Sequence, residues 1–203
     1  LYYATPIIMT GLSVGFAFKT GLFNIGTPGQ FIVGAFTAIY IGVRWTFIPS
    51  SVLWLVAMLG AMATGALWAL IPGLLKAFRN VNEVISSIMM NYIGMYLVNY
   101  LIVNSPVYDS SRNLTLPPAT SIPKMGLNVL FPNSGANGGV LIALLCVVVI
   151  YIILNKTTFG YELKACGYNR NASKYAGINE KKNIVLSMVI AGALAGLGGA
   201  LLY

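Results

Sequence analysis

The chain has 203 residues, of which 58% are hydrophobic and 8% are charged, and its formal net charge is +8. Soluble domains are roughly one-quarter charged, so this composition excludes an ordinary soluble protein and indicates a membrane protein. The Lys and Arg residues flank the apolar segments and form no separate basic patch, so nucleic acid is not an expected partner. The chain has no His and only two Cys, which argues against a metal site or a disulfide framework.

A helix that crosses the membrane needs about 20 mainly apolar residues. We therefore predict an all-α fold, a polytopic bundle of about five to six transmembrane helices in a single transmembrane domain over residues 1–203. Because the chain starts and stops within apolar runs, we expect it to be a fragment of a longer protein. The apolar segments are 1–18, 30–43, 51–75, 84–103, 138–154 and 184–203.

Residues 21–30 precede the second apolar segment and contain Gly21, Gly26, Pro28 and Gly29. A Gly/Pro break at membrane depth is tolerated only where protein or a water-filled cavity satisfies the freed backbone groups. Such a break is typical of a discontinuous helix beside a transport path. An ordinary loop between two spans is the alternative interpretation.

The distribution of charge predicts which loops face the cytoplasm. Loop 155–183 carries six Lys or Arg residues against two Glu residues, and segment 76–83 adds two more basic residues. Both segments should be cytoplasmic by the positive-inside tendency, which leaves 104–137 as an extracytoplasmic loop. That long loop, with a predicted turn at 133–135, is either a lid or partner-docking surface or a tolerated insertion.

Small residues recur at a spacing of four along several segments. In lipid there is no hydrophobic force between helices, so close backbone approach through small faces is how they associate. We therefore expect four such faces to pack against neighbouring helices. They are Gly11 and Gly15; Gly34, Ala38 and Gly42; Ala57, Ala61 and Gly65; and Gly192, Gly196 and Ala200.

The chain has only four acidic residues. Glu83 follows Asn80 by three positions, which predicts a capping box with Asn80 as the helix N-cap and Glu83 reaching back to its amide. Contact of Glu83 with an ion or a substrate is the alternative. We find no carboxylate pair and no nucleophile–base constellation within the spans, which argues against a membrane-embedded enzyme.

The cytoplasmic loop contains helix signals of its own. Asn169 is placed to cap a short helix that runs through Ala176, Gly177 suits the left-handed residue that ends it, and Asn179 is placed to cap the next helix. A short helix held between two spans can dock in another protein's groove. A helix lying on anionic lipid is the alternative, and small residues such as Ala172 favour protein contact.

Three stretches carry a resemblance to a known family. They are GLFNIGTPGQFIVGAF (21–36), VNEVISSIMMNYI (81–93) and TTFGYELKACGYNRNASKYAGI (157–178), the last followed by SMVIAGALAGLGGALL (187–202). The chain resembles the permease subunits of bacterial ABC importers for simple sugars and nucleosides, in the branched-chain amino acid/ribose permease superfamily. The nucleoside permeases are the more similar because of the Phe-Asn-Ile-Gly and Asn-Glu-Val stretches.

The resemblance implies a translocation subunit in the bacterial cytoplasmic (plasma) membrane that is not an enzyme and binds no cofactor. It implies two cytoplasmic nucleotide-binding ATPase subunits as partners, which would use ATP and Mg. A second permease subunit, identical or related, and an extracytoplasmic substrate-binding lipoprotein would complete the assembly. An ion-coupled secondary transporter of a small polar solute is the alternative, although such transporters usually carry an ionisable group inside a span.

The resemblance also assigns residues. Loop 155–183 resembles the family's coupling loop, and two positions depart from the family pattern: Pro28, where an acidic residue is common, and Cys166, where an aliphatic one is usual. The expected ATPase-coupling residues are Tyr161, Glu162, Ala165, Gly167, Asn169, Ala172, Tyr175, Gly177 and Ile178. The expected substrate path has Asn24, Gly26, Gly29 and Gln30 from the family's broken segment, with Phe23, Asn91 and Tyr92 as further aromatic and amide groups suited to ribose or a base.

Overall fold

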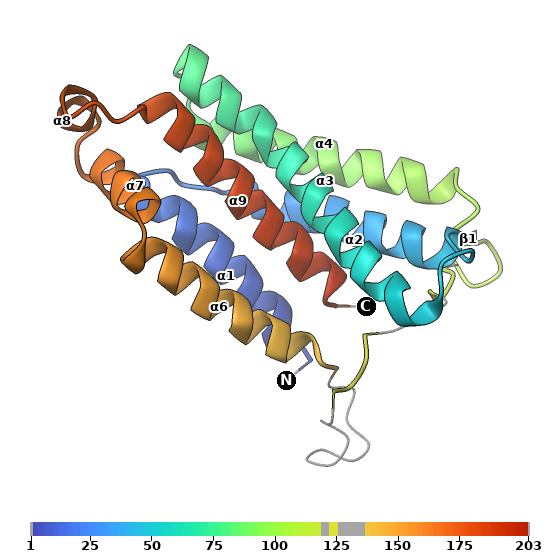
Figure 1. Cartoon of the computed structure of the whole chain (residues 1–203). Coiled ribbons are helices and arrows are strands. Elements are labelled where there is room, and N and C mark those ends of the chain that lie inside the picture. The colour runs from blue at the N-terminus through green and yellow to red at the C-terminus, as the bar shows by residue number, and fades with distance from the viewer. Residues whose placement is uncertain (1, 119–121, 126–136, 203) are drawn as a thin grey trace.

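The computed structural model describes residues 2–118, 122–125 and 137–202 and is helical apart from one short β hairpin (Figure 1). The helices are α1 (Ala4–Lys19), α2 (Thr27–Arg44), α3 (Ser50–Arg79), α4 (Glu83–Val103), α6 (Gly139–Lys156), α7 (Thr158–Tyr168), α8 (Arg170–Tyr175) and α9 (Glu180–Ala200). The strands β1 (Tyr108–Asp109) and β2 (Leu114–Thr115) pair antiparallel, with Tyr108 opposite Thr115.

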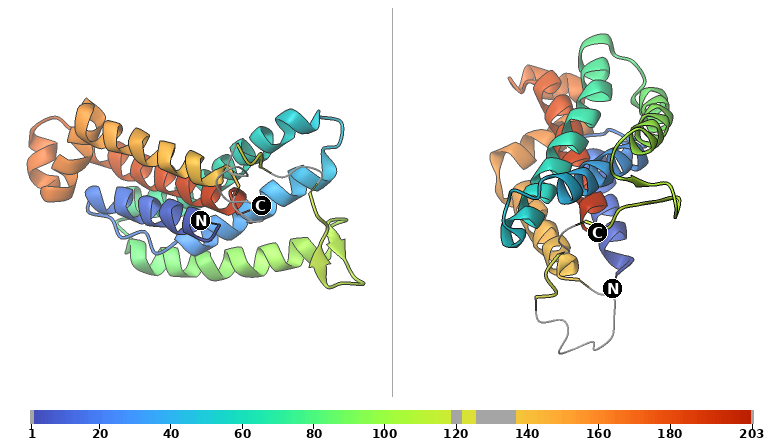
Figure 2. Two further views of the ribbon diagram at one scale, coloured as in Figure 1. Left: turned by 90° about the horizontal axis from the view of Figure 1, so that it is seen from below. Right: turned by 90° about the vertical axis from the view of Figure 1, so that its right-hand side faces the viewer.

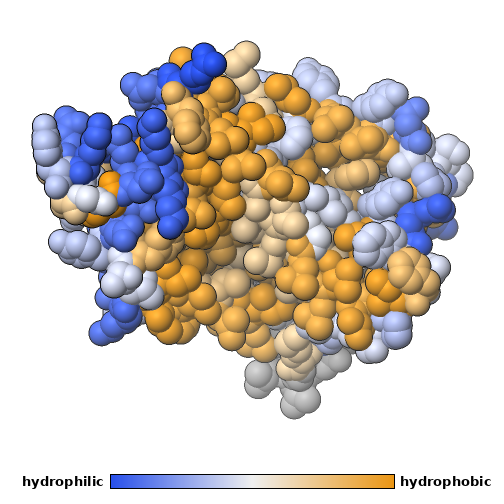
Figure 3. Space-filling model, turned by 45° about the horizontal axis from the view of Figure 1, so that its top comes forward, coloured by the Kyte–Doolittle hydropathy of each residue, from blue (hydrophilic) through white to orange (hydrophobic). Residues whose placement is uncertain are grey.

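All six predicted apolar segments form helices. Among the described residues, α3, α4, α6 and α9 are long and apolar enough to cross a membrane, and α1 is apolar but shorter. On the face shown in Figure 3, a broad hydrophobic surface lies between two hydrophilic ends. The predicted all-α, polytopic membrane fold is confirmed.

Helix α9 lies at the centre of the bundle. It packs against α1, α2 and α3, while α4 packs on α2 and α3, and α6 packs on α1 (Figures 1 and 2). Most of the apolar part of α9 is buried, whereas the other membrane-length helices keep most of their surface exposed. The position of every other long helix is therefore set directly or indirectly by its contact with α9.

Glycines on α9 allow this central position because they bring backbones into direct contact. A Cβ atom at Gly192 would collide with the backbone oxygen of Gly65, and one at Gly196 would collide with that of Ala61. Further along the same face of α9, a Cβ at Gly199 would collide with the backbone oxygen of Phe31 in α2. A Cβ at Gly34 of α2 would collide with the Gly196 backbone, so the predicted small-residue packing is confirmed for α2, α3 and α9.

For Gly11 and Gly15 on α1, the described residues of this chain supply no packing partner, so this part of the prediction stays a prediction. A Cβ at either position would meet nothing within 4 Å. Both glycines line an open, mainly apolar groove of about 920 Å³ between α1 and the start of α2. Helix α1 instead contacts α9 through its opposite face, where the buried Ser13 hydroxyl donates to the Ala191 carbonyl oxygen at 2.6 Å.

The predicted capping box at the α3–α4 turn is wrong. Asn80 ends α3 in the left-handed conformation (φ 48°), and Asn82 is the N-cap of α4, accepting from the Val84 amide at 2.9 Å. The two Asn residues compete for the cap, and Asn is one of the few residues that tolerates the left-handed region. The Glu83 carboxylate instead forms a salt bridge with Lys76 at 2.8 Å.

The predicted caps of the cytoplasmic loop are confirmed. The Asn169 side chain accepts from the Ala172 amide at 3.0 Å, and that of Asn179 accepts from the Lys182 amide at 3.1 Å. Gly177 adopts φ +79°, which ends the short helix α8 as predicted. Sequence reasoning missed α7, which is capped by Thr157 and precedes α8, so the loop contains two helices.

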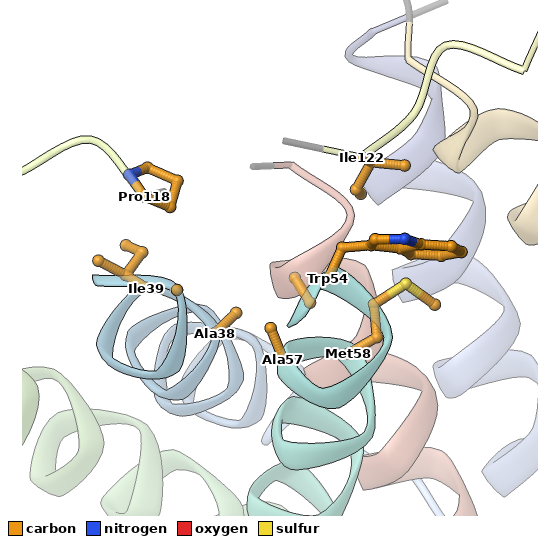
Figure 4. Close-up of a pocket in the computed structure, with 9 residues that line it drawn as sticks. Ala38, Ile39, Trp54, Ala57, Met58, Pro118 and Ile122 are labelled. Atoms are coloured by element: carbon orange, nitrogen blue, oxygen red, sulfur yellow. The ribbon is translucent and has the colours of Figure 1, made fainter. Parts of the chain in front are cut away.

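The described part of loop 104–137, predicted to be extracytoplasmic, folds back onto the bundle. Val107 is fully buried, and Ile122 is 5% exposed. Figure 4 shows Pro118 above the end of α2 and Ile122 beside Trp54 of α3, around a cavity of about 30 Å³. The choice between a lid or docking surface and a tolerated insertion stays a prediction, and the turn predicted at 133–135 lies outside the described residues.

The central glycines give the first prediction. Gly196→Ala should lower the free energy of unfolding by about 2 kcal/mol, because its Cβ meets backbone that cannot move aside. Gly15→Ala makes the same chemical change in open space and should leave stability unchanged or slightly raised, since Ala favours helix. Thermal melts of the full-length protein in detergent measure both, and equal melting temperatures for the two variants would contradict the packing account.

Candidate functional site

The chain between α1 and α2 is not helical. Gly21 adopts φ +68°, which turns the chain at the C-terminal end of α1. The buried Thr20 hydroxyl donates to the Ser187 hydroxyl at 2.8 Å, which ties the turn to α9. Residues 22–24 have no regular secondary structure, and α2 begins only at Thr27, with Pro28 in its first turn. The predicted break therefore separates two helices that pack against α9.

Two buried amides hold the break together. Asn24 and Gln30 are each 1% exposed, and their side chains bond reciprocally, Nδ2 to Oε1 at 3.0 Å and Nε2 to Oδ1 at 3.1 Å. The Asn24 Oδ1 also accepts from the Gly26 amide at 3.1 Å. Inside a membrane protein an unpaired amide is costly, so this closed network fixes the first turn of α2.

Asn91 of α4 attaches the break to the neighbouring helix. Its Oδ1 accepts from the Gly29 amide at 2.9 Å, and its Nδ2 donates to the Ile25 carbonyl oxygen at 2.8 Å. A Cβ at Gly29 would lie 2.8 Å from that Oδ1 and 2.9 Å from the Asn91 Cα. Glycine is therefore required at position 29 for α4 to approach so closely.

The structure brings five of the seven predicted path residues together and separates the other two. The five that lie together at the break and contact one another are Asn24, Gly26, Gly29, Gln30 and Asn91. Phe23 is 45% exposed and faces the groove between α1 and α2. Tyr92 is 58% exposed on the outer face of α4. The role of these residues in a substrate path stays a prediction.

Tyr92 belongs to a stripe that sequence reasoning missed. Tyr96 and Tyr100 follow it at intervals of four residues, and each is 66% exposed. Residues four apart lie on one face of a helix, so the spacing was the available signal. Ser87, on the opposite, buried face of α4, lies against Gly26, and its hydroxyl makes no hydrogen bond within the described structure.

Helix α7 is fixed to the bundle at three points. A Cβ at Gly160 would collide with the Ile153 carbonyl oxygen at the end of α6. The Glu162 carboxylate accepts from the buried Asn183 amide of α9 at 3.1 Å. A Cβ at Gly167 would collide with the Lys19 carbonyl oxygen, and one at Gly21 would lie 3.2 Å from the Gly167 oxygen. The last contact joins α7 directly to the beginning of the break.

The exposed side of the cytoplasmic loop is dominated by tyrosines. Tyr161, Tyr168 and Tyr175 are 72%, 91% and 94% exposed. Tyr168 was missed by sequence reasoning, although it lies midway between the two predicted tyrosines at seven-residue intervals. We name these three residues the tyrosine platform. Each ring is largely exposed and carries a polar hydroxyl, and tyrosine is enriched in protein interfaces.

The other predicted coupling residues fall into two groups. Ala172 is exposed beside the tyrosine platform, as are the cap residues Asn169 and Gly177. The rest face the bundle: Glu162, Ala165 and Ile178 are half-buried, and the backbone of Gly167 contacts the break. Cys166 is buried, and its sulfur lies 3.7 Å from the Asn183 amide nitrogen. The loop thus has an outward face and an inward, anchoring face.

Comparison with known proteins gives relatives along nearly the whole chain. The guanosine ABC transporter permease protein NupP of Bacillus subtilis is 43% identical over 197 residues, which cover 97% of this chain and 56% of the relative. The nucleoside ABC transporter permease protein NupB of Lactococcus lactis is 38% identical over 200 residues, 96% of this chain and 55% of the relative. The glucose ABC transporter permease protein TsgB13 of Haloferax volcanii is 33% identical over 210 residues, 98% of this chain and 54% of the relative.

The helical bundle and these relatives define a multi-pass integral protein of the plasma membrane. The chain belongs to the family described as branched-chain amino acid transport system / permease component, whose sequence pattern matches residues 1–203. It spans about half the length of the curated relatives it matches. No solved structure matches the chain.

The second prediction concerns Asn91. Asn91→Ala should leave the Gly29 amide and the Ile25 carbonyl unpaired, at a cost of about 1–3 kcal/mol for each buried group. Hydrogen exchange of the peptide covering 20–30 should therefore become faster in the full-length protein. Asn104→Ala is the control, because its exposed amide bonds only to the carbonyl of Tyr100, one turn away on its own helix. Unchanged exchange in Asn91→Ala would show that α4 does not hold the break.

Proposed function

We propose that this chain is the membrane-spanning core of a permease in an ATP-driven importer of nucleosides or simple sugars. The printed names of its relatives support this proposal, since those proteins are permeases for guanosine, nucleosides and glucose. Nucleosides are favoured because the relatives named for them reach 43% and 38% identity. The chain would translocate substrate, while ATP and Mg would be used by other subunits.

The expected partners follow from this role. Of two cytoplasmic ATPase subunits, one would bind the tyrosine platform of this chain. A second permease subunit would complete the path, and an extracytoplasmic lipoprotein would deliver substrate. The tyrosine platform suits an ATPase subunit because it belongs to loop 155–183, which lies beyond the membrane-length helices at the end predicted to be cytoplasmic. At the opposite end, the packed loop that contains Pro118 and Ile122 lies where a delivering protein would meet the bundle (Figure 4).

The contact between Gly21 and Gly167 is the main support for a mechanism in which movement of α7 is transmitted to the break. It places the backbone of α7 directly against the start of the break, with no side chain between them to absorb movement. Closure of the ATPase pair would push α7, and packed elements transmit displacement because protein interiors have few voids. The break would then shift relative to α4 and change the width of the path.

The break has the features of a segment that could adopt a second conformation with different hydrogen-bond partners. Its backbone is held by side-chain amides, which can exchange partners, and not by a continuous helical ladder. The unpaired, buried hydroxyl of Ser87 beside Gly26 is a donor that a shifted break would satisfy. Discontinuous helices in transporters occupy such positions beside the substrate.

The tyrosine stripe on α4 supports a water-filled or protein-covered path along that helix. Tyr92, Tyr96 and Tyr100 place three hydroxyls along the span, and a hydroxyl that faces hydrocarbon without a partner costs several kcal/mol. The face is therefore better suited to an aqueous path shared with a second permease than to lipid. Aromatic rings stack on nucleobases without strict sequence or base preference, which suits passage of a nucleoside.

Ion-coupled transport is less well supported by the structure. Two acidic residues lie in the first turns of membrane-length helices, Glu83 of α4 and Glu180 of α9, and Glu83 is paired with Lys76 beside the cytoplasmic turn. An ion-coupling carboxylate usually faces the interior of the bundle or a water-filled cavity. Glu83 instead fixes the α3–α4 turn.

The third prediction tests transmission through Gly167. Gly167→Val should collide with Lys19 and separate α7 from the break, so ATP-driven uptake of labelled guanosine should fall at least about tenfold. The full-length permease would be assembled with its partners in liposomes. ATPase association and the melting temperature would be measured in parallel to show that the variant is folded and assembled.

Thr158→Val is the matched control, because it changes an exposed position of the same helix without new backbone contact. It should retain uptake. Full uptake by Gly167→Val would contradict the transmission mechanism. Uptake that follows an ion gradient without ATP in the unaltered protein would contradict the importer itself.

The fourth prediction concerns the tyrosine platform. Tyr168→Ala combined with Tyr175→Ala should weaken ATPase binding by about 2 kcal/mol or more, the size expected for central aromatic residues of an interface. Co-purification and titration of the ATPase onto the full-length permease measure this change. Tyr3→Ala, at a 74% exposed position on the opposite end of the bundle, should bind normally. Undiminished binding by the double variant would place the ATPase elsewhere.

A further inference from the structure

A groove of about 410 Å³ runs between the cytoplasmic ends of α3 and α9, apart from the break and from the tyrosine platform. One wall belongs to α3 and the other to the first two turns of α9 and its cap. The groove opens outward, since the Leu74 and Phe78 side chains are 40% and 62% exposed. Its lining residues are Leu74, Phe78, Asn179, Lys181, Lys182, Val185 and Leu186.

The polar end of the groove is positively charged. Lys181 and Lys182 are both exposed, and the Lys181 ammonium lies 5.4 Å from the centre of the Phe78 ring. Of the seven described lining residues, these two carry positive charge and none carries negative charge. The amide groups of the first turn of α9 add a partial positive charge at the same end.

The other end of the groove is apolar. Val185 and Leu186 lie one turn further along α9, which enters the membrane from its cytoplasmic end, and both are half-buried. Leu74 precedes Phe78 by one turn on α3 and so lies at a similar depth. In a membrane, the two lysines would therefore lie at the level of the lipid headgroups. The apolar end of the groove would lie deeper, at the level of the acyl chains.

We propose that this groove is a binding site for an anionic phospholipid. The lysines bind the phosphate, and Leu74, Val185 and Leu186 contact an acyl chain. Basic pockets between membrane helices on the cytoplasmic side bind anionic headgroups in this way. The apolar wall favours a lipid over free phosphate or an acidic peptide, because neither of those would cover Leu74 and Leu186 with hydrocarbon.

The full-length permease in neutral detergent tests this site with phosphatidylglycerol as the probe. Native mass spectrometry should show retained phosphatidylglycerol, and the lipid should raise the melting temperature more than phosphatidylcholine does. Lys181→Gln with Lys182→Gln should weaken binding about thirtyfold, since each lysine near an anionic headgroup contributes roughly fivefold. Lys156→Gln with Lys174→Gln removes two cytoplasmic charges outside the groove and should leave binding unchanged.

A photoactivatable phosphatidylglycerol on the unaltered protein locates the lipid independently of any variant. Cross-links should map to the peptides that contain Leu74–Phe78 and Val185–Leu186. Equal stabilisation by inorganic phosphate alone would overturn the lipid assignment in favour of a free anion. Undiminished phosphatidylglycerol binding by the groove variant, or cross-links confined to other helices, would overturn the site.

Discussion

The absence of side chains along one line of α9 is the constraint on which the rest of the structure depends. Helices in lipid gain nothing from hydrophobic burial against one another, so they associate through close van der Waals packing. Gly192 and Gly196 permit backbone contact with α3, and Gly199 permits it with α2. A larger residue at any of these positions would separate α9 from a neighbour and remove the common support of α1, α2 and α3.

Helix α9 also connects the two parts of the candidate site. Near its cytoplasmic end Asn183 holds Glu162 of α7, and one turn further Ser187 holds Thr20 at the beginning of the break. The Gly21–Gly167 contact then joins α7 directly to the break, so that α9, α7 and the break each contact the other two. We propose that the break can respond to α7, because it is held through Asn24, Gln30 and Asn91 by amides that can exchange partners.

The sequence predicted those features that depend on neighbouring residues. The six apolar segments, the break and the caps at Asn169 and Asn179 all follow from local composition and spacing. The α3–α4 turn was predicted wrongly because Asn80 and Asn82 are both able to cap, and only the pairing of Glu83 with Lys76 decides between them. The bonds of Asn91 and the Gly21–Gly167 contact join residues 62 or more apart, and no local pattern marks them.

The central claim is that displacement of α7 reaches the break. Pulsed electron-spin distance measurements on the assembled full-length transporter test it directly, with Cys146→Ala to remove a half-buried native thiol. One label pair would join Tyr3 to Tyr161 of α7, and the other would join Tyr3 to Phe23 of the break. Our account predicts that ATP binding by the partner subunits changes both distance distributions together. A change at Tyr161 with none at Phe23 would contradict it.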